Sequence, residues 1–254
     1  MNEVSQKHIN PFVRALTLAW LSLLRPWLRR QVRRTVLETI DNHTFVVLPE
    51  VHNPVVFRSG AVLGRAVAQA AYAAAPIDYP IDYLGGRTRR ALDMGTGCGV
   101  GAVFAAHQGY DVVAVDINPD AVRCARINAL TNRCEDKVDV RHGDLFAPVA
   151  GEQFDLVLFN PPFFVGESRS LFDQSWRGVD VLERFARGLP EVLLESGQAL
   201  IVLSTDGVPG RLLAALEHHQ MALSIVMQRH LGNEIMTLYR ATRSRKLSRC
   251  RAKR

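Results

Sequence analysis

The sequence predicts an α/β fold built on a doubly wound, mostly parallel sheet of seven strands, with a helical N-terminal extension. From Arg89 onward, short apolar runs alternate with helix-length segments, and this alternation is typical of parallel sheets with helices on both faces. A glycine-rich turn follows the first of these runs. The last two runs flank Leu231-Gly232-Asn233, which indicates an antiparallel hairpin that closes the sheet.

The elements follow in order along the chain. Residues 11–40 predict two helices, with Pro26 near the start of the second, and residues 44–49 predict a strand. Residues 53–57 are expected to be extended and to lead into a helix over 61–75, with Arg58 or Ser59 near its N-terminus, where free N–H groups favour an anion. Further strands are expected over 90–94, 111–115, 138–141, 154–159, 199–203, 222–229 and 234–239, and helices near 100–108, 119–132, 181–193 and 210–218.

Charge is unevenly distributed over the 254 residues, whose net charge is +6. Residues 1–42 carry seven basic and three acidic side chains, and residues 240–254 carry eight basic and no acidic ones. The body between them is therefore net acidic, which argues against a basic groove across the fold. The basic C-terminal segment is either an arm for RNA, the ribosome or another anionic surface, or a solvated tail without a partner.

Cysteine spacing and hydropathy favour a cytoplasmic protein. Four cysteines, Cys98, Cys124, Cys134 and Cys250, show neither C-x-x-C spacing nor a zinc pattern, so we expect reduced thiols and no metal site. The apolar stretch from Ala15 to Leu28 is too short to span a bilayer and is interrupted by Arg25-Pro26. We expect a helical cap on the α/β domain there, although a basic amphipathic helix on a membrane is the alternative.

Three acidic residues end three successive predicted strands. Asp93 precedes the glycine turn and can accept from an amino group. Asp116 ends the next strand, where a carboxylate takes the two hydroxyls of a ribose. Asp144 follows the third strand and can accept from the adenine amino group, while Leu145 packs on the ring. A ligand with adenine, ribose and a free amino group but no phosphates fits S-adenosylmethionine.

The candidate cofactor site is assembled from these strand ends, the glycine turn and the segment before the core. Its predicted residues are Ser59, Asp93, Gly95, Thr96, Gly97, Cys98, Gly99, Asp116, Ile117, Asn118, Asp144, Leu145 and Asn160. Glycines let the backbone approach a ligand and turn tightly into a helix. For Cys98, a small filler between glycines is favoured over a nucleophile.

Asn160-Pro161-Pro162-Phe163 closes the apolar run 154–159 and is the candidate catalytic motif. Two prolines remove two backbone donors and fix two φ angles, which makes a rigid turn. We expect the Asn160 side-chain oxygen and the Pro161 carbonyl to be two fixed acceptors for a planar –NH₂ group, with Phe163 covering its face. A loop that merely ends a strand is the simpler interpretation of the motif alone.

Taken together, these motifs resemble those of class I S-adenosylmethionine-dependent methyltransferases, which have a Rossmann-like fold. Asn-Pro-Pro followed by an aromatic residue is typical of enzymes that methylate a planar nitrogen, among them HemK-type protein-glutamine N5-methyltransferases and several rRNA and tRNA methyltransferases. Residues 53–59, 174–185 and 231–234 also resemble HemK-type segments, including a hydroxyl before the core that contacts the cofactor. Most relatives have tyrosine where this chain has Phe163.

The resemblance implies three regions. Residues 1–85 would be a helical cap that covers the cofactor, 86–242 the methyltransferase domain, and 243–254 a basic disordered tail. It implies methyl transfer to a protein glutamine, as in a release-factor-like substrate. The alternatives are an exocyclic amine of RNA (N6 of adenine or N2 of guanine), with RNA or ribosome contact through the basic termini, a small-molecule amine, and a binding module that keeps the fold without activity.

Overall fold

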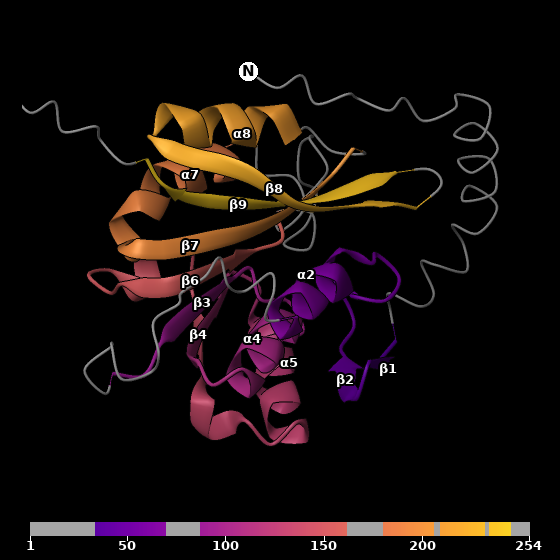
Figure 1. Ribbon diagram of the computed structural model, residues 1–254. Helices are drawn as coiled ribbons and strands as arrows, with labels where there is room; N and C mark the ends of the chain where they lie inside the picture. The colour runs from indigo at the N-terminus through magenta and orange to yellow at the C-terminus, as the bar shows by residue number, and fades with distance from the viewer. Residues whose placement is uncertain (1–33, 70–86, 162–179, 206–208, 232–233, 245–254) are drawn as a thin grey trace, which may run out of the picture.

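A seven-stranded sheet forms the centre of the protein in a computed structural model that describes residues 34–69, 87–161, 180–205, 209–231 and 234–244 (Figure 1). The strand order is β5-β4-β3-β6-β7-β9-β8. The strands are β3 (Arg90–Met94), β4 (Asp111–Asp116), β5 (Val138–His142), β6 (Phe154–Phe159), β7 (Leu193–Ser204), β8 (Met221–His230) and β9 (Ile235–Arg243).

Strand pairing confirms the predicted fold class. Strands β3 to β7 run parallel, β9 is antiparallel to β7, and β8 is antiparallel to β9. β7 begins at Leu193, earlier than the expected residue 199, because Leu193 pairs with Phe154 and Gln198 with Leu156 across an irregularity in the register. The carboxyl ends of β3, β4, β5 and β6 therefore lie side by side, as the site hypothesis requires.

Helices cover both faces of the sheet (Figure 1). One face carries α2 (Ser59–Ala68), α4 (Val100–His107) and α5 (Pro119–Thr131), and the other carries α7 (Val181–Val192) and α8 (Pro209–His218). Side chains of β6 alternate between the two layers: Leu156 and Leu158 pack in one core, and Val157 and Phe159 in the other. Because both of their faces are buried, the central strands β3, β4 and β6 are nearly continuous apolar runs.

The described part of the N-terminal region holds a β-hairpin, so the helix predicted up to residue 40 is wrong at its end. β1 (Val36–Ile40) pairs antiparallel with β2 (His43–Val47). Burial along β1 alternates residue by residue, which is the period of a strand. Residues 1–33, with the rest of that prediction and the apolar stretch from Ala15, lie outside the described residues.

Residues 53–57 form a turn and are not extended as expected. The Asn53 side-chain oxygen accepts from the amides of Val55 and Val56, at 2.9 and 3.0 Å, and such bonds are typical of an Asx turn. The helix that follows, α2, begins at Ser59.

At the other end of the chain, Arg243 was expected to begin the tail but is the last residue of β9, and its guanidinium donates to the Leu193 carbonyl.

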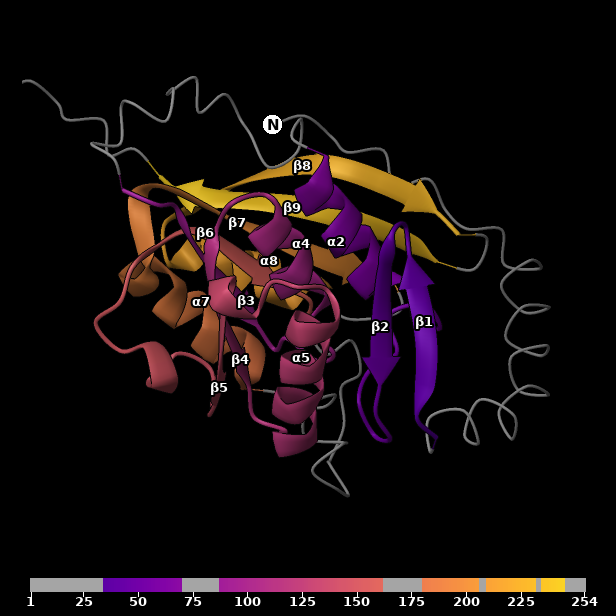
Figure 2. The same cartoon turned by 90° about the horizontal axis from the view of Figure 1, so that it is seen from below.

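Three asparagines of α5 and its ends attach the segment 44–50 to the core. The Asn128 side chain accepts from the Val46 amide and donates to the Val46 carbonyl, both at 2.7 Å. Asn132 donates to the Thr44 carbonyl and Asn118 to the Glu50 carbonyl. Figure 2 shows α5 alongside β2. This attachment places the chain after β2 beside the carboxyl ends of β3 and β4.

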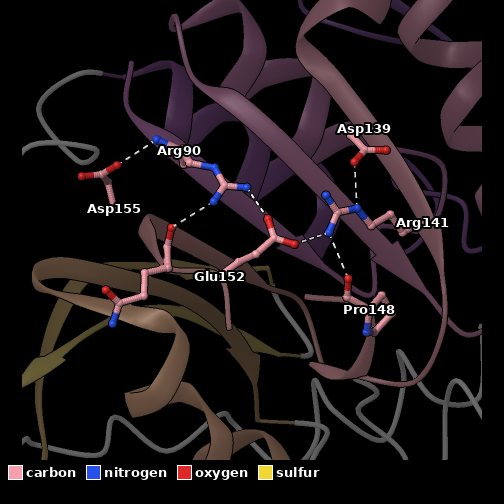
Figure 3. A network of polar contacts seen from close by, with 7 residues as sticks. Arg90, Asp139, Arg141, Pro148, Glu152 and Asp155 are labelled. Carbon is pink, nitrogen blue, oxygen red and sulfur yellow. Dashed lines mark hydrogen bonds and ion pairs between the residues drawn. The ribbon is translucent and has the colours of Figure 1, made fainter. Parts of the chain in front are cut away.

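An ionic network fixes the connection between β5 and β6, which contains only the short 3-10 turn η3 (Ala147–Val149) (Figure 3). Glu152 pairs with both Arg90 of β3 and Arg141 of β5. Arg141 also donates to the Pro148 carbonyl at 2.9 Å. The chain thus crosses between two distant strands along a defined path, and that path begins at the loop that carries Asp144.

Candidate functional site

A cavity opens at the carboxyl ends of β3, β4, β5 and β6. Its wall contains the loops after these strands, the segment between β2 and α2, and the first residue of α7. Among the predicted cofactor residues, the wall includes Asp93, Gly95, Thr96, Gly97, Cys98, Asp116, Ile117, Asn118, Asp144, Leu145 and Asn160. Residues from six separate stretches of the chain therefore meet in one place.

Two predicted cofactor residues, Ser59 and Gly99, do not line this cavity. Gly99 precedes α4 with a φ of 86°, and a β-carbon there would lie 3.1 Å from the Ala125 backbone. Gly99 therefore lets α4 pack closely on α5. Ser59 is fully buried at the start of α2, and its hydroxyl has no hydrogen-bond partner among the described residues, whereas the next residue, Gly60, does line the cavity.

Asp93 holds the glycine turn in shape. Its Oδ2 accepts from the Thr96 hydroxyl at 2.6 Å and from the Ala102 amide at 2.9 Å. A β-carbon on Gly101 would lie 2.5 Å from Oδ1, so only glycine fits there. Burial raises the pKa of Asp93 to about 6, although the bonds from Thr96 and Ala102 oppose the rise.

Asp116 ends β4 and connects two loops of the site. One carboxylate oxygen accepts from the Gly97 amide at 2.8 Å and the other from the Asn118 amide at 2.9 Å. Burial raises the pKa of this carboxyl, and the backbone donors oppose the rise. Each oxygen has a second acceptor position, so the residue can accept further hydrogen bonds from a ligand in the cavity.

Asp144 and Leu145 lie in the loop after β5. The Gly143 amide donates to the Asp116 carbonyl at 3.0 Å, so this loop is connected to the end of β4. Leu145 has a φ of 46°, a left-handed conformation that a leucine adopts only where its surroundings impose it. The Asp144 carboxylate accepts from the Arg184 guanidinium of α7 at 2.5 Å.

Asn160 and Pro161, at the end of β6, line the same cavity. The Asn160 Oδ1 atom is buried and has no hydrogen-bond partner among the described residues. A buried carbonyl oxygen without a donor costs free energy, and such groups in a cavity wall are typical of ligand contacts. Pro162 and Phe163, the rest of the predicted catalytic motif, lie outside the described residues.

Sequence reasoning missed Glu50 and His52, which line the cavity from the segment after β2. Glu50 has a φ of 61°, and its carbonyl accepts from Asn118. His52 stacks on Phe57 with ring centroids 4.6 Å apart, and burial lowers the pKa of its imidazole to about 4. The residues around Asn53-Pro54 are typical of a turn and were the available signal for this segment. No local pattern indicated that the segment after β2 folds back over the glycine turn.

Cys98 is buried, and burial raises the pKa of its thiol well above the ordinary value. Since the thiolate is the nucleophile, this environment favours the filler role. Within the described ranges, no group of three His, Cys, Asp or Glu side chains is arranged to hold a metal ion. None of the helices in those ranges is long and apolar enough to cross a membrane.

The family model and the curated relatives that match this chain are all described as methyltransferases. The model of a family described as "Methyltransferase small domain" matches residues 81–224. The ribosomal protein uL3 glutamine methyltransferase of Bradyrhizobium diazoefficiens is 33% identical over 48% of this chain and 41% of its own length. The tRNA1(Val) (adenine(37)-N6)-methyltransferase of Bacteroides thetaiotaomicron is 32% identical over 52% of this chain and 59% of its own length.

The fold also matches solved structures. The T. thermophilus 16S rRNA N2 G1207 methyltransferase, in complex with AdoMet and guanosine, aligns with a TM-score of 0.59 and 22% identity, over 83% of this chain and 50% of that one. At this identity the match shows the fold alone. This chain spans about half the length of the curated relatives described above.

Proposed function

Because this chain belongs to the methyltransferase small domain family, we propose that it transfers a methyl group from S-adenosylmethionine to a planar nitrogen, with a protein glutamine side chain as the acceptor. The observation that carries the proposal is the Asn160 Oδ1 atom, buried in the cavity wall without a donor among the described residues. An acceptor –NH₂ group would supply that donor.

The residues of the cavity fit S-adenosylmethionine. Asp116 retains acceptor positions for the ribose hydroxyls, and Asp144 can accept from the adenine amino group beside Leu145. Asp93, Gly95 and Gly97 line the part of the cavity next to the glycine turn, where the amino acid end would lie. Asn118, which caps the start of α5, also lines the cavity. Ser59 does not line it, and belongs to the proposed set through its place at the start of α2 beside the cavity-lining Gly60.

When bound, the cofactor supplies a methyl group on a positively charged sulfur. A carboxamide nitrogen is a poor nucleophile because its lone pair is delocalised, so orientation must supply much of the rate. Asn160 Oδ1 and the Pro161 carbonyl would each accept one N–H of the acceptor, which directs the lone pair and stabilises positive charge developing on nitrogen. Phe163 would cover the planar face. No general base is needed before transfer, because the product loses its proton afterwards.

Protein glutamine is favoured as the acceptor by the similarity to the uL3 glutamine methyltransferase and by the acidic body of the chain. RNA is the second candidate, because the adenine-N6 tRNA methyltransferase is almost as similar. In that case the basic ends would contact phosphates. The proposed division of the chain follows: a cap in residues 1–85, a catalytic domain in 86–242 and a basic tail beyond.

Two substitutions test the proposal. Asn160→Ala should reduce methyl transfer by on the order of 100-fold or more, since a lost acceptor at a developing charge costs several kcal/mol, while calorimetry shows S-adenosylmethionine binding close to that of the wild type. Asp116→Ala should weaken cofactor binding roughly 10- to 100-fold, because hydrogen bonds to a charged group are lost. Asn132→Ala, whose amide contacts Thr44 outside the cavity, is the matched control.

The acceptor is identified by incubating the protein with ribosomes, release factors and methyl-labelled cofactor, followed by separate protease and nuclease digestion. Label in a glutamine-containing peptide supports the protein acceptor, and label in a nucleotide supports RNA. An RNA acceptor should also bind with a steep salt dependence that falls when residues 240–254 are removed. A wild-type protein that binds no S-adenosylmethionine contradicts the proposal as a whole.

A further inference from the structure

Among the described residues that line the cavity, Arg184 of α7 pairs with Asp144 alone. Its guanidinium lies 2.5 Å from Asp144 Oδ2, and its other terminal nitrogen lies 3.7 Å from Asp180. Arg184 is not part of the cavity wall, whereas Asp144 is. Any effect of Arg184 on a ligand in the cavity therefore acts through the Asp144 carboxylate.

The Arg184–Asp144 pair is too exposed to contribute much to folding. The two side chains are 36% and 43% exposed, and solvent screening leaves exposed pairs of this kind little effect on stability. A charge-assisted hydrogen bond nevertheless restricts the rotamer of the carboxylate. The main consequence of the pair is orientation. Arg184 occupies Oδ2, and no described residue donates to Oδ1, which remains as an acceptor.

Helix α7 is itself fixed against both halves of the site. Phe185, next to Arg184, is fully buried and stacks on Phe159 at 3.8 Å and on Phe146 at 5.5 Å between ring centroids. Phe159 immediately precedes Asn160, and Phe146 lies two residues after Asp144. A β-carbon on Gly188 would lie 2.5 Å from the Phe146 ring, so α7 and the Asp144 loop are in close contact. Arg184 is thus held on a rigid support.

We propose that Arg184 is a positioning residue that gives the cofactor site its preference for a 6-amino purine, by fixing the Asp144 carboxylate so that Oδ1 accepts from the amino group. This inference rests on the proposed function, in which Asp144 faces adenine. A 6-oxo purine presents an oxygen at the same position, and that oxygen repels the carboxylate. Without Arg184, the carboxylate turns among its rotamers and discriminates less.

The test measures the affinity of the full chain for S-adenosylhomocysteine and S-inosylhomocysteine by calorimetry. The wild type should prefer the adenine compound by on the order of 10-fold or more, as expected for a hydrogen bond to a charged acceptor. Arg184→Gln should lose most of that preference with an unfolding midpoint near that of the wild type. Arg184→Lys should restore part of it, because an ammonium can still pair with Oδ2. Glu183→Gln breaks the neighbouring pair with Arg211 of α8 and should leave the preference unchanged.

The same measurement in the Asp144→Ala variant shows whether Arg184 acts through Asp144 or affects purine binding directly. In Asp144→Ala, which should itself lose the preference, adding Arg184→Gln should change nothing further. The inference is overturned if Arg184→Gln keeps the wild-type preference, or if it further reduces the preference in the Asp144→Ala variant. Either result leaves the proposed function intact. A wild type that binds neither compound overturns the proposed function instead, and the inference with it.

Discussion

Replacing Asp93 by asparagine should make the protein more stable at neutral pH and less able to bind its cofactor. Asp93 is 4% exposed, and its Oδ2 accepts from Thr96 and Ala102. An asparagine oxygen can accept both bonds, so the substitution removes the buried charge and keeps the local structure. The cavity wall, however, loses the carboxylate proposed to accept from the cofactor.

The magnitude follows from the pKa of Asp93, which burial raises from 3.8 to about 6. One pKa unit corresponds to about 1.4 kcal/mol, so the charged carboxylate costs the folded protein about 3 kcal/mol above pH 6. Because the folded state binds this proton more tightly than the unfolded chain, the contribution of Asp93 to the free energy of unfolding is greatest below about pH 3.8. It is lost as the pH rises through about 6.

Urea unfolding of wild type and Asp93→Asn at several pH values between 4 and 8 measures the effect. The variant should be up to about 3 kcal/mol more stable at pH 7.5, and the difference should shrink toward zero near pH 4. Asp136→Asn removes an exposed carboxylate in the 3-10 turn η2 (Glu135–Lys137) and controls for net charge. A difference that does not vary with pH, or a variant less stable than the wild type at pH 7.5, refutes the reasoning.

Two further substitutions probe the packing around the site. Asn128→Ala should lower the free energy of unfolding by about 2–4 kcal/mol, because it removes three hydrogen bonds to the backbone of β2 and the glycine turn and leaves the Val46 amide without its acceptor. Urea unfolding measures this change. A loss below about 1 kcal/mol would contradict the prediction. Gly101→Ala places a β-carbon 2.5 Å from the Asp93 carboxylate and should cost about 1–3 kcal/mol and most of the cofactor affinity. Gly210→Ala, at a position with no described residue within 4 Å of the added β-carbon, should lower neither quantity in the same calorimetric and unfolding assays.

Local patterns predicted the elements of the catalytic domain. The runs 90–94 and 154–159 are strands with the predicted bounds, and the helix near 119–132 begins at Pro119, where the Asn118 side chain caps it. Such signals depend on neighbouring residues, so a sequence carries them directly. The helix expected up to residue 40 failed because its last residues pair with 43–47, and local periodicity did not reveal that pairing.

The sequence by itself determined the order of the strands and helices from β3 onward and the acids that end three of those strands. Because parallel strands present their carboxyl ends at one edge, it also determined that Asp93, Asp116 and Asp144 would meet. Only the tertiary structure decided what each acid contacts. Asp93 accepts from Thr96 of the glycine turn and from Ala102 of α4, Asp116 accepts from two backbone amides, and Asp144 accepts from Arg184, 40 residues away. It also decided that Asn160 Oδ1 stays without a donor among the described residues. These outcomes depend on rotamers and on contacts between segments far apart in the chain, which packing of the whole fold selects.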